Sequence, residues 1–190
     1  MNKNLSPQLV TSLLVITFLV GVMSGFFFTP EYVVMKDEEK KPMMDLGKTD
    51  RYLDLRYVDG LIAHHMSAIH MSEQALLHST RPEIRSLAQT IIDLDTKGIQ
   101  QLYANKKEWY GDTRQIEKFQ KINLGNPDEK FDLRFLNSMI THHEQAIEMA
   151  HDVKTKSMRT EVLNTADEVL SILVPNLDQL QAWRKEWFGV

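Results

Sequence analysis

The stretch HHMSAIHM at residues 64–71 returns as HHEQAIEM at residues 142–149, which is 78 positions later. The same offset relates Asp54-Leu55-Arg56 to Asp132-Leu133-Arg134, and Trp109-x-Gly111 to Trp187-x-Gly189. Because the offset never changes, the two copies have elements of equal length, as expected when one supersecondary unit is duplicated. All 7 histidines fall in the front part of the two copies, so the search for a functional site begins there.

Each copy of the repeat contains two stretches in which apolar residues recur at helical spacing. In the first copy these stretches are separated by Ser79-Thr80-Arg81-Pro82, where the proline fits the first turn of a helix but not its interior. No strand pattern competes with the helices. The sequence therefore predicts an all-α domain, an up-down four-helix bundle made of two repeated helical hairpins with approximate two-fold symmetry.

We expect this bundle to occupy residues 50–190. It divides into repeat one at residues 50–111, a polar connector at residues 112–127 and repeat two at residues 128–189. Asp50 and Asp128 are expected to cap the first helix of each repeat. Pro175 predicts a bend, though not a break, in the fourth helix.

Residues 9–29 form an apolar run without a charged side chain, preceded by a short flank at residues 1–8. The run has the length of a bilayer span and exceeds the apolar part of a typical cleaved signal peptide. We therefore expect an uncleaved, single-pass transmembrane helix. Residues 30–49 are polar and lack helical periodicity, so we expect a flexible tether between membrane and bundle. The charges on the two sides of the run do not by themselves fix its orientation.

The composition excludes several classes of site. The chain has 22 Lys and Arg against 26 Asp and Glu residues, a formal net charge of -4, and no basic stripe. Nucleic-acid binding is therefore not expected. The absence of cysteine excludes disulfides and thiolate metal sites.

The histidine pairs predict a metal site. At about 100° per residue, His64 and His65 flank the apolar stripe of their helix, so both are able to point into the bundle beside the small Ala68. Imidazole binds copper, zinc, iron and nickel, whereas a thioether favours Cu(I). The combination predicts a metal ion, with copper preferred and zinc or iron as alternatives. The predicted ligands are His64, His65, Met71, His142, His143 and Met149.

Asp54 and Asp132 stand on the same helix faces, three turns before the histidines. A carboxylate at such a place either ligates a metal ion or accepts a hydrogen bond from the second imidazole nitrogen. We therefore expect both aspartates to be additional ligands or to hold the histidine ligands in position.

Other interpretations of these residues remain open. Buried histidines sometimes only form hydrogen bonds with neighbouring carboxylates, which would make the domain a structural or interaction module. A di-iron carboxylate site needs repeated Glu-x-x-His motifs, and Glu148-x-x-His151 supplies only one. The sequence has no nucleophile motif and no element for substrate recognition, so it favours a protein that is not an enzyme.

The motif Asp-x9-His-His-x2-Ala-Ile-x-Met, present twice and followed each time by a terminal Trp, resembles the family called domain of unknown function 305. The resemblance covers residues 50–190 and implies a ferritin-like four-helix bundle. It also implies a bacterial protein that is exported or membrane-anchored, and some members are periplasmic copper-binding proteins implicated in copper tolerance. The family motif maps onto Asp54, His64, His65, Met71, Asp132, His142, His143 and Met149. The family pattern carries Gln and Glu in the second helix of each unit, where this chain has Asp95, Gly98, Leu173 and Asn176.

Our first hypothesis is therefore a membrane-anchored, extracytoplasmic metal-binding protein that stores, buffers or hands over copper. It would sit in a bacterial inner membrane through residues 9–29, with its domain in the periplasm or outside the cell. Its partner would be an unidentified protein that donates or accepts the metal. The second hypothesis is a non-catalytic structural or interaction module with hydrogen-bonded core histidines.

Overall fold

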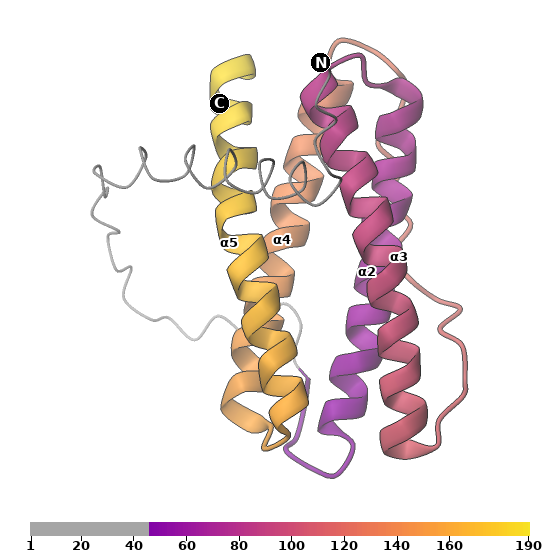
Figure 1. The fold of residues 1–190 in the computed structure, drawn as a ribbon. Coiled ribbons are helices and arrows are strands. Elements are labelled where there is room, and N and C mark those ends of the chain that lie inside the picture. The colour runs from indigo at the N-terminus through magenta and orange to yellow at the C-terminus, as the bar shows by residue number, and fades with distance from the viewer. Residues whose placement is uncertain (1–45) are drawn as a thin grey trace, which may run out of the picture. The chain divides into compact units, whose positions relative to one another are not determined.

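The structure, a computed structural model, describes residues 46–190 of the chain. The predicted membrane helix at residues 9–29 and most of the predicted tether lie outside the described residues. The described part contains four helices and no strand (Figure 1): α2 Leu53–His78, α3 Pro82–Tyr110, α4 Phe131–Lys156 and α5 Thr160–Phe188. None of these four helices is both long and apolar enough to cross a membrane. The all-α prediction is thus confirmed for residues 46–190.

The helices form two hairpins of equal dimensions. Residues 79–81 join α2 to α3, and residues 157–159 join α4 to α5. α3 and α5 are capped at their ends by Gly111 and Gly189, whose φ angles of 64° and 71° lie in the left-handed region that favours glycine. The repeated Trp-x-Gly motif therefore marks the end of each hairpin.

Helix α5 runs without interruption through Pro175, so the proline does not break it, as predicted. The two aspartates that were expected to cap helices do not do so. α2 and α4 begin only at Leu53 and Phe131, and neither has a side-chain cap. Asp50 and Asp128 instead accept hydrogen bonds from the backbone N–H two residues further on, at 2.8 and 2.9 Å, and so fix the turn that leads into each helix.

The helix directions differ from a simple up-down order. Asp54 near the start of α2 contacts Arg159 beyond the end of α4, and Asp132 contacts Arg81 in the same way, so α2 and α4 are antiparallel. α3 and α4 consequently run in the same direction, and the chain between them passes along the whole bundle (Figure 1). Residues 111–130 are long enough for this path, because an extended chain of that length reaches about 65 Å and α3 spans about 43 Å.

This crossing connector is anchored on the bundle by side chains of α2 and α4. Gln74 donates to the carbonyl of Ile122 and accepts from the N–H of Leu124, at 2.8 and 2.9 Å. Arg134 donates to the carbonyl of the buried Leu124. Its counterpart Arg56 donates to the carbonyl of the buried Leu46. The repeat therefore extends back to Leu46, and the last residues of the expected tether pack on the bundle.

The apolar core is divided into two clusters at opposite ends of the bundle. One contains Tyr57 and Leu61 from the front of α2 together with Met149 from the back of α4. The other contains Phe135 and Met139 from the front of α4 together with Met71 from the back of α2. Most of the buried positions in residues 46–190 belong to α2 and α4, which meet at the centre of the bundle. The histidines occupy the level between the two clusters.

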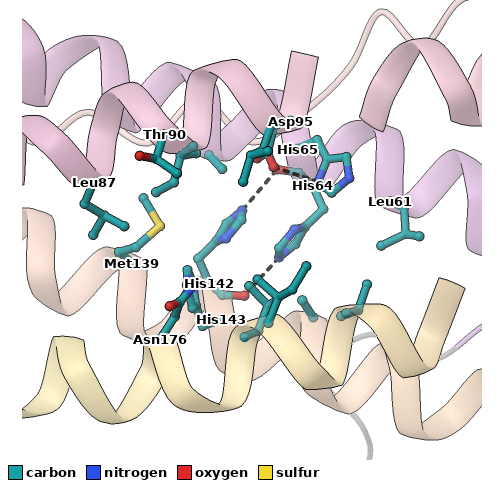
Figure 2. A pocket seen from close by; sticks show the side chains of 17 residues that line it. Leu61, His64, His65, Leu87, Thr90, Asp95, Met139, His142, His143 and Asn176 are labelled. Carbon is teal, nitrogen blue, oxygen red and sulfur yellow. Dashed lines mark hydrogen bonds and ion pairs between the residues drawn. The ribbon is translucent and has the colours of Figure 1, made fainter. Parts of the chain in front are cut away.

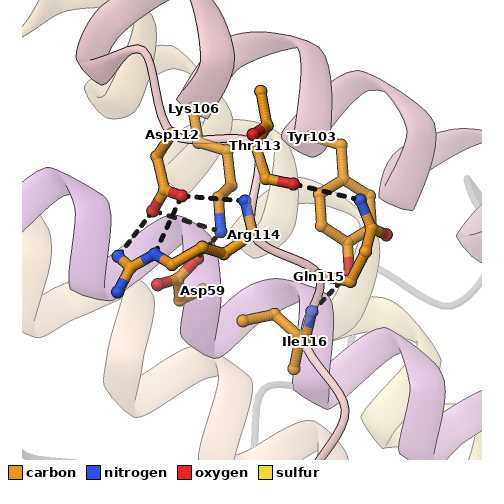
Figure 3. Close-up of polar contacts among 8 residues, drawn as sticks. All are labelled: Asp59, Tyr103, Lys106, Asp112, Thr113, Arg114, Gln115 and Ile116. Atoms are coloured by element: carbon orange, nitrogen blue, oxygen red, sulfur yellow. Dashed lines mark hydrogen bonds and ion pairs between the residues drawn. The ribbon is translucent and has the colours of Figure 1, made fainter.

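A buried lysine fixes the start of the connector (Figure 3). Lys106 in α3 has no exposed surface, and its Nζ lies 2.7 Å from Asp59 Oδ1 and 3.5 Å from Asp112 Oδ2. Arg114 binds the same carboxylate of Asp112 and, by donating hydrogen bonds, holds the pKa of Asp112 well below its ordinary value. The second repeat has Arg184 and Asn137 at the positions of Lys106 and Asp59, joined by a longer contact of 3.3 Å.

Lys106→Ala should lower the free energy of unfolding by about 3 kcal/mol, because it leaves Asp59 without its cation and opens a gap in the packing. Denaturant titration of the full-length chain measures the change. The matched control is Lys107→Ala at an exposed position of the same helix, with an expected change within about 0.5 kcal/mol. Equal effects of the two substitutions would contradict a structural role for the buried charge.

Candidate metal centre

His64 of α2 and His142 of α4 meet at the centre of the bundle (Figure 2). Their rings are stacked, with centroids 3.5 Å apart and an interplanar angle of 29°. The Nε2 atom of His64 lies 2.9 Å from the backbone oxygen of His142, and the Nε2 atom of His142 lies 3.0 Å from the backbone oxygen of His64. A reciprocal pair of hydrogen bonds therefore joins the two repeats across their symmetry axis.

These contacts define the protonation of both rings. A carbonyl oxygen only accepts, so each Nε2 carries the hydrogen, and in a neutral ring Nδ1 then keeps a free lone pair. Burial lowers the pKa of His64 to about 4, while its hydrogen bond to His142 opposes the shift. Burial and the nearby His64 hold the pKa of His142 well below its ordinary value. Both imidazoles are neutral at pH 7, which is the form that binds metal ions.

His65 and His143 flank this stack. Burial lowers the pKa of each to about 4, and the nearby His64 adds to the effect. His65 packs closely on α3, where a Cβ atom at Gly98 would lie 3.1 Å from His65 Nε2. The Nδ1 atom of His143 is buried and makes no hydrogen bond of normal geometry, although the Met139 carbonyl opposes part of the effect of burial on its pKa. His143 Nδ1 is therefore a candidate ligand atom.

A cavity of about 90 Å³ joins all four of these histidines. Its wall comes from all four helices and is largely apolar, as Figure 2 shows. Leu94 of α3 and Ile172 of α5 line it and are 54% and 42% exposed, so they mark its opening toward solvent. The structure thus brings both predicted histidine pairs together at one place.

Two further donor side chains line the cavity and were not among the predicted ligands. Met139 stands one helical turn before His143, so the helical spacing alone could have identified it. Asp95 comes from α3, and its Oδ1 lies 3.7 Å from His65 Nδ1. Burial raises the pKa of Asp95 to about 7. Only the packing of α3 on α2 places this carboxyl group, and the repeat pattern did not contain that information.

Met71 and Met149 are not in the cavity wall. Both are fully buried, and each packs in the apolar cluster at its own end of the bundle. Met149 lies against Gly60, where an added Cβ would approach its sulfur to 3.3 Å. In this structure both side chains are part of the apolar core. Their role as ligands stays a prediction.

Asp54 and Asp132 lie about 15 Å from the histidines along their helices. Asp54 accepts hydrogen bonds from Ser157 at 2.6 Å and Arg159 at 3.3 Å. The Arg159 guanidinium in turn stacks 4.7 Å from the ring centre of Trp109. At the other end Arg81 likewise lies between Asp132 and Trp187, although Asp132 Oδ1 makes no hydrogen bond. Each motif aspartate thus binds the hairpin loop of the other repeat in this structure.

Comparison with known proteins identifies the family. The family model described as "Domain of unknown function (DUF305)" matches residues 54–130 and, a second time, residues 132–189. The chain belongs to the DUF305 family. No curated protein matches it significantly.

Three solved structures that resemble this DUF305 chain are forms of one protein, CopM. The Cu(I)-bound form is 27% identical, with a TM-score of 0.64 over 72% of this chain and 98% of that chain. The Ag-bound form obtained by soaking is 26% identical, with a TM-score of 0.65 over 72% and 97%. The apo form is 28% identical, with a TM-score of 0.64 over 72% and 98%. The bundle is therefore similar to that of a protein whose structures contain Cu(I) or silver.

The donor set of this DUF305 domain fits a metal ion such as copper, although not without side-chain movement. Neutral imidazoles and the unpartnered His143 Nδ1 suit it chemically. Within residues 46–190, however, no three His, Asp or Glu side chains are placed to hold one ion as they stand. The alternative di-iron motif has less support, because Glu148 and His151 are exposed and do not line the cavity.

Acidification should destabilise the DUF305 bundle. The buried histidines have a lower pKa in the folded than in the unfolded chain, so their contribution is complete above pH 6.5 and is lost as the pH falls toward 4. Asp95, whose pKa is raised, works in the opposite direction but is a single group. We expect the free energy of unfolding to fall by at least about 3 kcal/mol over this range, the effect of one such histidine. Denaturant titrations at several pH values measure it. His64→Gln should flatten the profile, whereas the exposed His151→Gln should leave it unchanged.

Asp54→Ala should lower the free energy of unfolding by about 2 kcal/mol, because it leaves Ser157 and Arg159 without their shared acceptor. Metal affinity should remain within a factor of two of the parent value. Denaturation and metal titration of the same preparation separate the two effects, with the exposed Glu73→Ala as control. A tenfold loss of metal affinity would instead support the predicted role of Asp54 at the metal site.

Proposed function

We propose that this DUF305 protein binds copper in the cavity between its two repeats. The observation that carries the proposal is the convergence of four largely neutral imidazoles, three buried and His65 partly buried, on one cavity, two from each repeat. Rings that are already neutral release no proton when a metal binds, so the site is ready for a cation at neutral pH. The apolar wall excludes most water from the ion and strengthens its bonds to the ligands.

Copper is favoured over other ions by the donor types. Imidazole binds copper as well as zinc, and the thioether of Met139 in the same wall favours Cu(I). The similarity to CopM, with structures in the Cu(I)-bound and Ag-bound forms, supports the same choice. We propose His64, His65, His142 and His143 as the ligands. Met71 and Met149 stay predictions, because they lie in the end clusters.

Metal binding would proceed by exchange at the histidine stack. The Nε2 atoms of His64 and His142 are engaged by backbone carbonyls, and no three His, Asp or Glu side chains of residues 46–190 are placed to hold one ion, so the rings would have to shift before an ion gains a full set of ligands. Each such bond contributes about 1 kcal/mol, which is small compared with the free energy of metal coordination. The hydrogen bonds of the stack would therefore stabilise the metal-free site, and metal coordination would be strong enough to break them.

We further propose that the domain lies outside the cytoplasm and is anchored by residues 9–29, from its apolar sequence and charge-free length. There it would buffer copper or pass it to another protein without chemical turnover. The exposed apolar opening at Leu94 and Ile172 gives a path for transfer between proteins. A protein that gives copper to this domain, or takes copper from it, would need a site of comparable affinity for copper.

One observation favours a second candidate function. The reciprocal hydrogen bonds of His64 and His142 satisfy both Nε2 atoms without a metal ion, as expected of a purely structural pair. In that case the domain is an interaction module. Chelators would then change neither its stability nor its interactions.

Copper titration tests the proposal. The full-length chain should bind at least one Cu(I) per chain in competition with a chromogenic chelator, and the quadruple variant His64→Gln, His65→Gln, His142→Gln, His143→Gln should lose at least 100-fold in affinity. The matched control replaces the three histidines outside the cavity, His70, His78 and His151, and should bind as tightly as the parent.

Circular dichroism shows whether each variant is folded. If the quadruple variant does not fold, the single variant His143→Gln serves instead, since this side chain donates no hydrogen bond of normal geometry through Nδ1. Parent-like affinity in a folded cavity variant would disprove copper binding at this site. Nitrogen hyperfine coupling in the spectrum of the Cu(II) protein gives an independent check on the imidazole ligands.

A further inference from the structure

The two repeats do not contribute equally to the cavity. The histidine positions are identical, but Asp95 of α3 faces the cavity where the second repeat has Leu173 of α5. Both residues line the same wall. Because the fold accommodates leucine at one of the two equivalent positions, the bundle does not need a carboxyl group there for its packing.

The surroundings of Asp95 give the carboxyl group no structural partner of the usual kind. Its side chain is 20% exposed, and its only ionic contact among residues 46–190 is with His65, which is itself 22% exposed. The distance of 3.7 Å between Asp95 Oδ1 and His65 Nδ1 is too long for a hydrogen bond. A carboxylate beside an apolar wall without a cation is unfavourable unless something else compensates its charge.

We propose that Asp95 is an oxygen ligand for a divalent ion bound beside His65, and that it determines how strongly the cavity prefers Cu(II) to monovalent ions. The inference rests on the proposed copper-binding function and assigns a role to one side of that site. Two neighbouring donors of a square-planar Cu(II) ion at about 2.0 Å lie about 2.8 Å apart, so the two side chains need to approach by about 1 Å.

The chemistry of the ligands explains the selectivity. A carboxylate is a hard donor that binds divalent ions well and gains little with Cu(I) or Ag(I). It also compensates one positive charge, which matters more for a divalent than for a monovalent ion in an apolar cavity. The opposite side of the cavity, with Met139 and Leu173, has no carboxylate and offers a thioether. The site is therefore polar on its α3 side and soft on its α4 side.

The test compares Asp95→Leu, which copies the second repeat, with the parent in the full-length chain. Cu(II) and Ag(I) are titrated separately, Ag(I) serving as a monovalent probe that does not change oxidation state. We expect the Cu(II) affinity of Asp95→Leu to fall at least tenfold and its Ag(I) affinity to stay within a factor of two. The Cu(II) electron paramagnetic resonance spectrum should change while nitrogen coupling persists. The matched control is Asp93→Leu, at an exposed position of the same helix.

Each outcome is informative. An unchanged Cu(II) affinity and spectrum in Asp95→Leu would overturn the inference, and so would an equal loss of both ions. Failure of the parent chain to bind either ion would overturn the proposed function itself, which is a different result. Thermal unfolding followed by circular dichroism verifies that the variant is folded, and Asp95→Asn provides a second variant that preserves the size of the side chain.

Discussion

The contact between His64 and His142 fixes how the two repeats meet. Each ring donates to the backbone of the other helix, and the two rings stack at 3.5 Å, so α2 and α4 are held in one register. Above and below this level, the apolar clusters fill the two ends of the bundle. A polar level between two apolar ones is tolerable only because these hydrogen bonds satisfy the buried Nε2 atoms. The same register brings His65 and His143 to a single cavity.

Charged contacts hold the two ends of the bundle, and the proposed ligands lie at its centre. At the ends, Asp54 with Arg159, and Asp132 with Arg81, each tie a helix start to the loop of the other repeat, beside a terminal Trp. At the centre, burial keeps the imidazoles neutral and leaves one nitrogen without a partner. The charged contacts at the ends therefore do not involve the proposed ligands.

The sequence predicted the hairpins and the meeting of the histidine pairs. A constant offset between the repeats means that equivalent helices have equal lengths and bury equivalent faces. It did not predict that α3 and α4 run in the same direction, since a connector of this length permits either path. Asp95 was missed as a donor because its position depends on how α3 packs on α2. The aspartates of the motif were expected near the histidines, but a shared helix face does not imply proximity when nine residues intervene. Met71 shares its face with the predicted site in the same way, yet lies among apolar side chains.

Where the two repeats differ is as informative as where they agree. The Asp–Arg–Trp contacts recur at both ends, as a two-fold fold requires. The cavity wall departs from this symmetry. Asp95 in the first repeat corresponds to Leu173 in the second, and Leu61 in the first corresponds to Met139 in the second. A symmetric cavity would offer an ion two equivalent sets of donors, whereas this wall offers a carboxylate on one side and a thioether on the other. Since hard and soft donors prefer different ions and different oxidation states of copper, we expect such a wall to distinguish between ions that a symmetric one would bind alike.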